Sequence, residues 1–169
     1  MPNWCSNDLS LEGDKDKILA AMKDIHPIDD GGSVDENVVE FNLAVPMPSE
    51  LHDTVSPARG DDATRKRLRA MHGADNWYDW SVKNWSTKWT GLECFVGWQG
   101  DNYYSIEFES AWAPPENWLK KLAPKHPDVK FSLTYDEPGL CFDGELTMQG
   151  DKVLAEYCRE TNPEVCNED

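Results

Sequence analysis

Long apolar segments are missing from this chain of 169 residues. No run approaches the roughly 18 apolar residues that a membrane-spanning helix needs. The first residues, Met1 to Cys5, show neither the basic nor the apolar region of a secretory signal peptide. We therefore expect a cytoplasmic protein with no membrane segment.

Metal-binding and redox motifs are also missing. The five cysteines, Cys5, Cys94, Cys141, Cys158 and Cys166, include no C-x-x-C pair, and the four histidines form no H-E-x-x-H pattern. There is no glycine-rich phosphate loop. The sequence therefore predicts no metal site and no cofactor, and isolated cysteines of this kind are expected to be small core residues.

Positive charge is scarce. Sixteen bases against thirty-two acids give a net charge of −16, which opposes binding to DNA because that affinity comes largely from Lys and Arg. One stretch differs: residues 59–69 contain five bases and two acids. This segment is either a solvated helix that balances its neighbours or a local docking patch.

Tryptophan is abundant instead. The chain has eight, and Trp77, Trp80, Trp85 and Trp89 all fall within residues 77–89. This density indicates either an unusually aromatic core or a surface that stacks on a ligand. The spacings of three, five and four residues do not fit a strand, so we predict a short helix over 77–85. We expect Trp85 and Trp89 to join a core between this segment and a sheet.

Apolar periodicity predicts the remaining elements. Strands are predicted over 7–12, 38–43, 92–98, 103–111, 129–135 and 140–148, and helices over 15–25, 62–71, 114–122 and 151–159, with a helical turn at 46–51. Without the segment at 46–90, the order matches the split β-α-β-β-α-β arrangement. We therefore predict an α+β, ferredoxin-like antiparallel sheet with two helices on one face, a helical Trp-rich insertion at about 46–90, and one or two extra strands. Residues 1–150 would form this domain, and 151–169 a C-terminal helix and an acidic tail.

Five motifs carry a resemblance to a known family. They are Met-Pro-Asn-Trp-Cys-Ser-Asn at 1–7, Pro-Met-Pro-Ser-Glu-Leu at 46–51, Asn-Trp-Ser-Thr-Lys-Trp at 84–89, Ala-Trp-Ala-Pro-Pro at 111–115 and Tyr-Asp-Glu-Pro-Gly-Leu-Cys-Phe-Asp-Gly at 135–144. In this order they resemble the YubB ferredoxin-like family of phage and plasmid proteins. Ser86 stands where that family's motif has glycine. The resemblance implies a fold, a mobile-element context and no known catalysis.

The open face of the predicted sheet is acidic. If Leu9, Ile106, Phe131 and similar residues point inward, the period of two leaves carboxylates on the other side. RNA-recognition sheets of similar topology place aromatic rings there. This face is instead suited to water, a cation or a basic partner. The candidate partner-binding residues are Glu12, Glu40, Glu107, Glu109, Asp143 and Glu145.

The sequence favours a non-enzymatic, phage- or plasmid-encoded accessory protein of the bacterial cytoplasm. It would bind a host or mobile-element protein that has a basic surface, for example by mimicking nucleic acid toward a host defence or regulatory complex. The alternative is a single-stranded nucleic-acid-binding protein that uses the basic segment 59–69 and the Trp cluster 77–89. Its contact residues would be Arg65, Lys66, Arg67, Arg69, Lys83 and Lys88. A metal-assisted hydrolase on paired carboxylates such as Glu107 and Glu109 is a third reading, although such pairs on open sheets are usually only solvated.

Overall fold

Strand β1 (Trp4–Glu12) is the middle strand of the sheet, and its residues alternate between buried and accessible positions because one face of the sheet is covered. It pairs antiparallel with β4 on one side and with β5 on the other. The computed structural model describes residues 3–98 and 100–161. Its sheet has seven strands in the order β2-β3-β4-β1-β5-β6-β7. The other strands are β2 (Val38–Val39), β3 (Leu92–Trp98), β4 (Tyr103–Ala111), β5 (Lys130–Glu137), β6 (Phe142–Gln149) and β7 (Lys152–Glu160).

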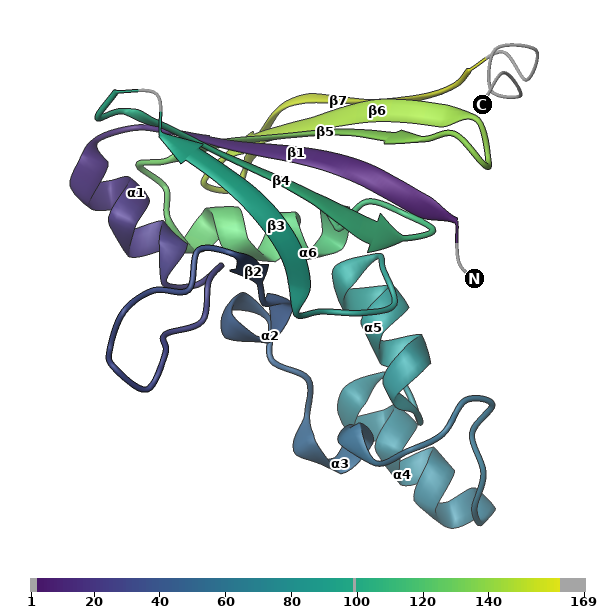
Figure 1. The fold of residues 1–169 in the computed structure, drawn as a ribbon. Coiled ribbons are helices and arrows are strands. Elements are labelled where there is room, and N and C mark those ends of the chain that lie inside the picture. The colour runs from purple at the N-terminus through teal and green to yellow at the C-terminus, as the bar shows by residue number, and fades with distance from the viewer. Residues whose placement is uncertain (1–2, 99, 162–169) are drawn as a thin grey trace.

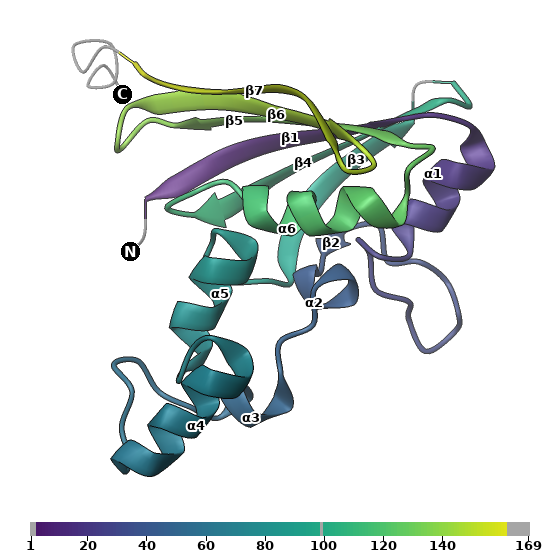
Figure 2. The same ribbon diagram turned by 180° about the vertical axis from the view of Figure 1, so that it is seen from behind.

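The helices lie on one side of this sheet (Figures 1 and 2). They are α1 (Lys15–Met22), α2 (Phe41–Ala44), α3 (Ser49–His52), α4 (Asp62–His72), α5 (Trp77–Trp85) and α6 (Glu116–Leu122), which continues as the 3-10 turn η1 (Ala123–Lys125). The four strands β3, β4, β1 and β5, joined through α1 and α6, give the β-α-β-β-α-β arrangement. The predicted fold class is confirmed, with β2, β6 and β7 as additions at the two edges.

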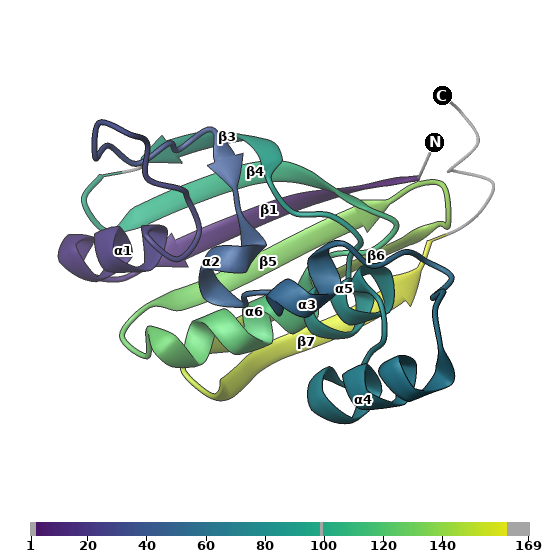
Figure 3. The ribbon, with the colours of Figure 1, turned by 90° about the horizontal axis from the view of Figure 1, so that it is seen from below.

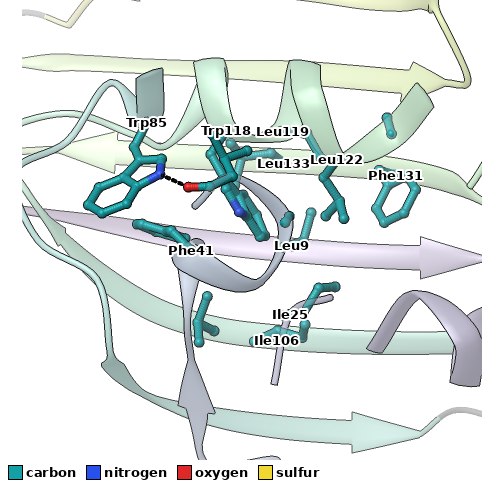
Figure 4. Packing of buried hydrophobic residues seen from close by; sticks show 14 of the residues in the cluster. Leu9, Ile25, Phe41, Trp85, Ile106, Trp118, Leu119, Leu122, Phe131 and Leu133 are labelled. Atoms are coloured by element: carbon teal, nitrogen blue, oxygen red, sulfur yellow. Dashed lines mark hydrogen bonds between the residues drawn. The ribbon is translucent and has the colours of Figure 1, made fainter. Parts of the chain in front are cut away.

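An aromatic cluster joins the insertion to the sheet. The Phe41 ring from α2 lies with its centroid 4.8 Å from that of Trp118 and 5.9 Å from that of Trp85. Leu9 and Leu133 of the sheet complete this core, as Figure 4 shows. The prediction for Trp85 is confirmed, because its indole is 2% exposed. Trp89 is only partly buried.

Helices α3, α4 and α5 extend away from the sheet, and Figure 3 shows that they lie toward one end of it. The predicted α4 and α5 are confirmed within a residue. Gly73 ends α4 in the left-handed conformation, with φ of 74°. Ser86 ends α5 in the same conformation, with φ of 71°. This backbone geometry explains why glycine would suit position 86.

Parts of the resemblance motifs have structural roles. Asn7 is buried, and its side-chain amide donates to the carbonyls of Cys5 and Phe108 and to the hydroxyl of Ser110. Gly144 lies beneath the Tyr135 ring, where a Cβ atom would collide with the phenol. These contacts position the ends of β1, β4, β5 and β6 relative to one another.

Two predicted elements are wrong. The helix predicted over 151–159 is strand β7, which pairs with β6 after a tight turn at Gly150. The domain therefore continues past residue 150, to Glu160 at least. The acidic tail, predicted within 151–169, falls on residues 162–169, which lie outside the described residues.

The strand predicted over 38–43 is also wrong beyond its first two residues. Only Val38 and Val39 pair with β3, and Phe41 begins helix α2. Glu40 causes the change of direction, because its side chain accepts a hydrogen bond from the Asn42 backbone N–H and so caps α2.

Candidate functional site

The face of the sheet opposite the helices carries rows of directly opposed side chains. In one row, Phe95 of β3 lies opposite Glu107 of β4, Glu107 opposite Asp8 of β1, and Asp8 opposite Thr134 of β5. In the next row, Glu109 of β4 and Asp136 of β5 lie on either side of Ser6. Four carboxylates on three neighbouring strands are thus brought together.

These rows line a shallow hollow of about 730 Å³, which we call the acidic trough. Its side chains include Asp8, Glu93, Glu107, Glu109 and Asp136 together with Trp4 and Phe95. The Phe95 side chain is 82% exposed. The trough therefore combines an exposed aromatic ring on β3 with carboxylates on β3, β4, β1 and β5.

The carboxylates of the trough lack ion-pair partners in the described part of the chain. Among the residues that the structure describes, no Lys, Arg or His forms an ion pair with any of the five acids. The pKa of Asp8 is raised, first by partial burial and then by the charge of Glu107. Like charges directly opposite on a sheet are destabilising. This arrangement therefore lowers the free energy of unfolding of the isolated protein.

Three other predicted acids of this face, Glu12, Asp143 and Glu145, do not line the trough and already have partners. Asp143 pairs with Arg159 at 2.9 Å, and Glu12 pairs with Lys130 at 2.9 Å. Glu145 accepts a hydrogen bond from the Thr147 hydroxyl. Asp143 and Glu145 lie on β6, three strands away from β4, opposite Asp136 and Thr134 of β5, and neither lines the trough.

Glu40 is not part of this face. Its carboxylate accepts hydrogen bonds from the Asn42 side chain and from the Thr90 hydroxyl at 2.6 Å, in addition to its capping bond. The expectation that Glu40 faces a partner across the sheet is therefore corrected: Glu40 holds α2 against the segment before β3.

Sequence reasoning missed Trp4, Phe95 and Glu93. Phe95 lies in the run Cys94-Phe95-Val96, where neighbouring apolar residues hide which face each one takes. Trp4 begins β1 three residues before the predicted start of that strand. A longer alternating pattern over 4–12 was the signal that could have placed Trp4 on the open face.

The basic residues of α4 are mostly engaged within the protein. Arg65 and Arg69 both contact the Asp75 carboxylate, at 3.0 and 2.7 Å, and this carboxylate is buried. Arg67 pairs with Glu50 at 2.8 Å. Burial alone would raise the pKa of Asp75, but the hydrogen bonds and charges of its partners outweigh burial and lower it. Lys66 has no ion-pair partner in the described parts of the chain.

The two lysines of the Trp cluster differ. Lys83 reaches the carbonyl of Gly73 at 3.5 Å and so helps to end α4. Lys88 lies over two indoles, with its Nζ atom 4.2 Å from the ring centroid of Trp89 and 5.0 Å from that of Trp112. Lys88 is therefore a part of an aromatic arrangement and is less available to phosphate.

A series of aromatic contacts begins at Trp4, which also lines the acidic trough. Trp4 contacts Trp89 with 6.1 Å between centroids, Trp112 contacts Tyr78 at 6.2 Å, and Tyr78 contacts Trp77 at 5.7 Å. Lys88 connects the two halves. We call these five rings and Lys88 the aromatic band. Trp77 and Trp89 also line a second hollow of about 330 Å³ beside Met47 and His52.

Two further findings concern metals and membranes. Across residues 3–98 and 100–161, no three His, Cys, Asp or Glu side chains are grouped so that they could hold a metal ion. Within the same residues, none of the helices has the length and apolar character needed to cross a bilayer.

The strand order and the helices on one face define a protein of the ferredoxin-like α+β class. A family model described as a ferredoxin-like domain in Api92-like protein matches residues 84–169, and the chain belongs to this family. A solved relative in fold is the crystal structure of a protein api92 from Yersinia pseudotuberculosis. It has 9% sequence identity and a TM-score of 0.60, and the match covers 96% of this chain and 100% of that chain. No curated protein matches the sequence.

Proposed function

We propose that this protein is a non-enzymatic accessory protein that binds a protein partner with a basic surface through the acidic trough. One observation carries the proposal: five carboxylates without ion pairs among the described residues line one trough with an exposed phenylalanine. An exposed aromatic ring beside charged groups can serve as an anchor of an interface. A partner's Lys or Arg side chains would relieve the repulsion between Asp8 and Glu107.

The charge of the whole chain supports the same partner. A net charge of −16 attracts basic surfaces over a distance and raises the rate of encounter. One form that such binding could take is mimicry of nucleic acid toward a protein that normally binds it. The resemblance of five motifs to the YubB family favours a mobile-element context, in which the partner is a host or element protein of the bacterial cytoplasm.

The direct experiment compares two variants with the same change of charge. The trough variant is Asp8→Asn, Glu107→Gln, Glu109→Gln, Asp136→Asn. The control is Asp30→Asn, Asp53→Asn, Asp151→Asn, Glu160→Gln, at exposed acids outside the trough that form no ion pair in the described residues. A photo-crosslinking residue at position 95 identifies the protein that contacts the trough in bacterial cells.

We expect crosslinking at position 95 to capture a protein with a basic surface, and to do so in the control background only. Loss of capture in both backgrounds would show that net charge alone attracts the partner. Equal capture in both would show that the trough is not the binding surface.

The nucleic-acid alternative has one supporting observation, the partly exposed indoles beside Lys88. Against it, Arg65, Arg67 and Arg69 already bind acids of the same protein. Gel shifts with single- and double-stranded DNA and RNA separate the two functions. Tight binding at physiological salt that is lost in a Lys66→Ala, Lys88→Ala variant would overturn the preferred function.

A further inference from the structure

The aromatic band exposes rings that proteins usually bury. The Trp4 side chain is 40% exposed and Trp112 is 37% exposed, whereas Trp85 and Trp118 are buried in the core. Tryptophan is enriched at interfaces because one end of the ring is apolar and the other carries a hydrogen-bond donor. A row of such rings on the surface is therefore a candidate contact surface.

The exposed residue Trp112 has a strained backbone conformation. Its φ is 68°, in the left-handed region that a bulky residue rarely adopts. The Trp112 backbone N–H donates to the carbonyl of Asn3 at 2.9 Å, which helps to fix this conformation. Strain that persists at an exposed ring is a feature of functional sites.

The indoles of the band have free donors. Of the indole N–H groups of Trp4, Trp77, Trp89 and Trp112, none donates a hydrogen bond within the described part of the chain, whereas that of Trp85 donates to the Val45 carbonyl at 2.9 Å. Exposed donors beside apolar ring faces suit a ligand with apolar rings and accessible carbonyl groups. A polyproline II segment has both, because its backbone makes no internal hydrogen bonds.

Charge determines which ligand the band can accept. Lys88 is the cation of the band, and two rings cover it. Trp4 belongs to the band and also lines the acidic trough. A single ligand that crosses from one surface to the other must therefore be basic at the trough, which disfavours a nucleic-acid strand and a second copy of this acidic chain.

We propose that the aromatic band binds a proline-rich segment of the partner, adjacent to the basic residues that occupy the acidic trough. This inference rests on the proposed function. It adds that the partner's segment next to the basic residues is rich in proline. Prolines pack on aromatic faces and lose little conformational entropy on binding, because the segment is already extended.

The test uses fluorescent peptides. The first is Arg-Lys-Arg-Ala-Pro-Pro-Leu-Pro-Pro-Leu-Pro, the second replaces every proline with glycine, and the third replaces the three basic residues with glutamine. Binding of each is measured with the wild type, with Trp112→Ala and with the trough variant. We expect the first peptide to bind the wild type best, and Trp112→Ala to weaken it on the order of tenfold or more. The second peptide should be insensitive to Trp112→Ala.

The outcomes separate the two proposals. If Trp112→Ala leaves the first peptide unaffected while the trough variant abolishes binding, the band proposal is overturned and the proposed function stands. If only the trough variant is without effect, the proposed function fails. Band-dependent binding of a thymidine oligonucleotide that is tighter than the first peptide, or band-dependent self-association in sedimentation, would also overturn the proline-rich ligand.

A measurement on the wild-type protein tests the proposal even if a variant fails to fold. In the 15N-labelled wild type, the first peptide should shift the indole N–H signals of Trp4, Trp89 and Trp112 and leave those of the core residues Trp85 and Trp118 in place. Unchanged signals for the three band indoles at saturation would contradict the proposal.

Discussion

The indole N–H of Trp85 donates to the backbone carbonyl of Val45 at 2.9 Å, and this bond fixes α5 to the segment that follows α2 (Figure 4). The neighbouring core indole behaves differently. Trp118 is fully buried, and its N–H has no hydrogen-bond partner within the described residues. Two tryptophans of one core thus differ in what their polar atom contributes.

This difference predicts unequal costs for the same substitution. Trp85→Phe loses a buried hydrogen bond and leaves the Val45 carbonyl unpaired, so we expect a loss of about 2–4 kcal/mol in the free energy of unfolding. Trp118→Phe removes a donor that is already unpaired, so its cost should be lower by about 1–2 kcal/mol. Denaturant titration of both variants measures the difference. Equal costs would mean that ring volume alone decides.

Ser86 gives a second prediction. Its left-handed backbone favours glycine, but its hydroxyl accepts a hydrogen bond from the Asn117 N–H at the start of α6, at 3.1 Å. Ser86→Gly exchanges strain for this bond, so stability should stay within about 1 kcal/mol of wild type. Ser86→Ala keeps the strain and loses the bond, and should cost about 1–2 kcal/mol. Thermal unfolding that ranks alanine above glycine would contradict this reasoning.

Asp75 should be the most sensitive acid of the insertion. It is buried against Arg65 and Arg69, so Asp75→Asn should cost about 2–4 kcal/mol at pH 7. Glu50→Gln, at an exposed ion pair, is the control and should cost less than about 1 kcal/mol. The pKa of Asp75 is lowered in the fold. Its contribution is therefore present above the unfolded pKa of 3.8 and is lost as pH falls below it.

His26 should make the fold sensitive to mild acid. Its Nδ1 atom lies 2.8 Å from the Val38 carbonyl and its Nε2 atom 3.3 Å from the Tyr104 hydroxyl. Burial lowers the pKa of His26 from 6.5, against the opposing effects of the Val38 bond and of Glu36 and Asp35. The unfolded chain therefore binds a proton first, and stability falls below about pH 6.5 by up to about 1.4 kcal/mol per pH unit.

The matched variant is His26→Gln. We expect it to be less stable than wild type at pH 7 and to lose less further stability between pH 7 and pH 5. Parallel slopes for the two proteins in urea titrations at these pH values would assign the acid sensitivity to other groups.

The protein should be more stable when a charge of the acidic trough is removed. Asp8→Asn removes the repulsion from the directly opposed Glu107 and should raise the free energy of unfolding by a few tenths to about 1 kcal/mol. The gain should shrink in high salt, which screens exposed charges. A loss of several kcal/mol in the same measurement would show that the Asp8 carboxylate has a stabilising partner.

The sheet core was predictable because alternation is visible wherever only one face is buried. Leu9, Ile106 and Phe131 are all fully buried as expected. Strand β7 was not predictable in the same way. Nearly all of its residues are exposed, so Val153, Leu154 and Tyr157 follow no period of two and resemble one side of a helix. The pairing of β7 with β6 decides its structure, and tertiary pairing leaves no local signal.

The candidate site was predictable only in part, for a related reason. Alternation placed Glu107 and Glu109 on the open face, but strand order decided that Asp8 and Asp136 join them. Asp143 lies opposite Asp136, but its ion pair with Arg159 could not be read from the sequence. The aromatic band depends on loops that meet in space, and no spacing in the sequence brings Trp4 beside Trp89.

The helical insertion also separates the charge of the molecule. Residues 46–90 hold seven bases and six acids, a net charge of +1. Because the whole chain has a net charge of −16, the remaining residues carry −17. Helices α3 to α5 of this insertion extend away from the sheet (Figure 1). The negative charge of the chain is therefore concentrated outside the insertion, in the part that includes the acidic face of the sheet. A cationic surface would exert a torque on the protein before contact and would turn the sheet toward itself, so that collisions begin with the acidic end foremost.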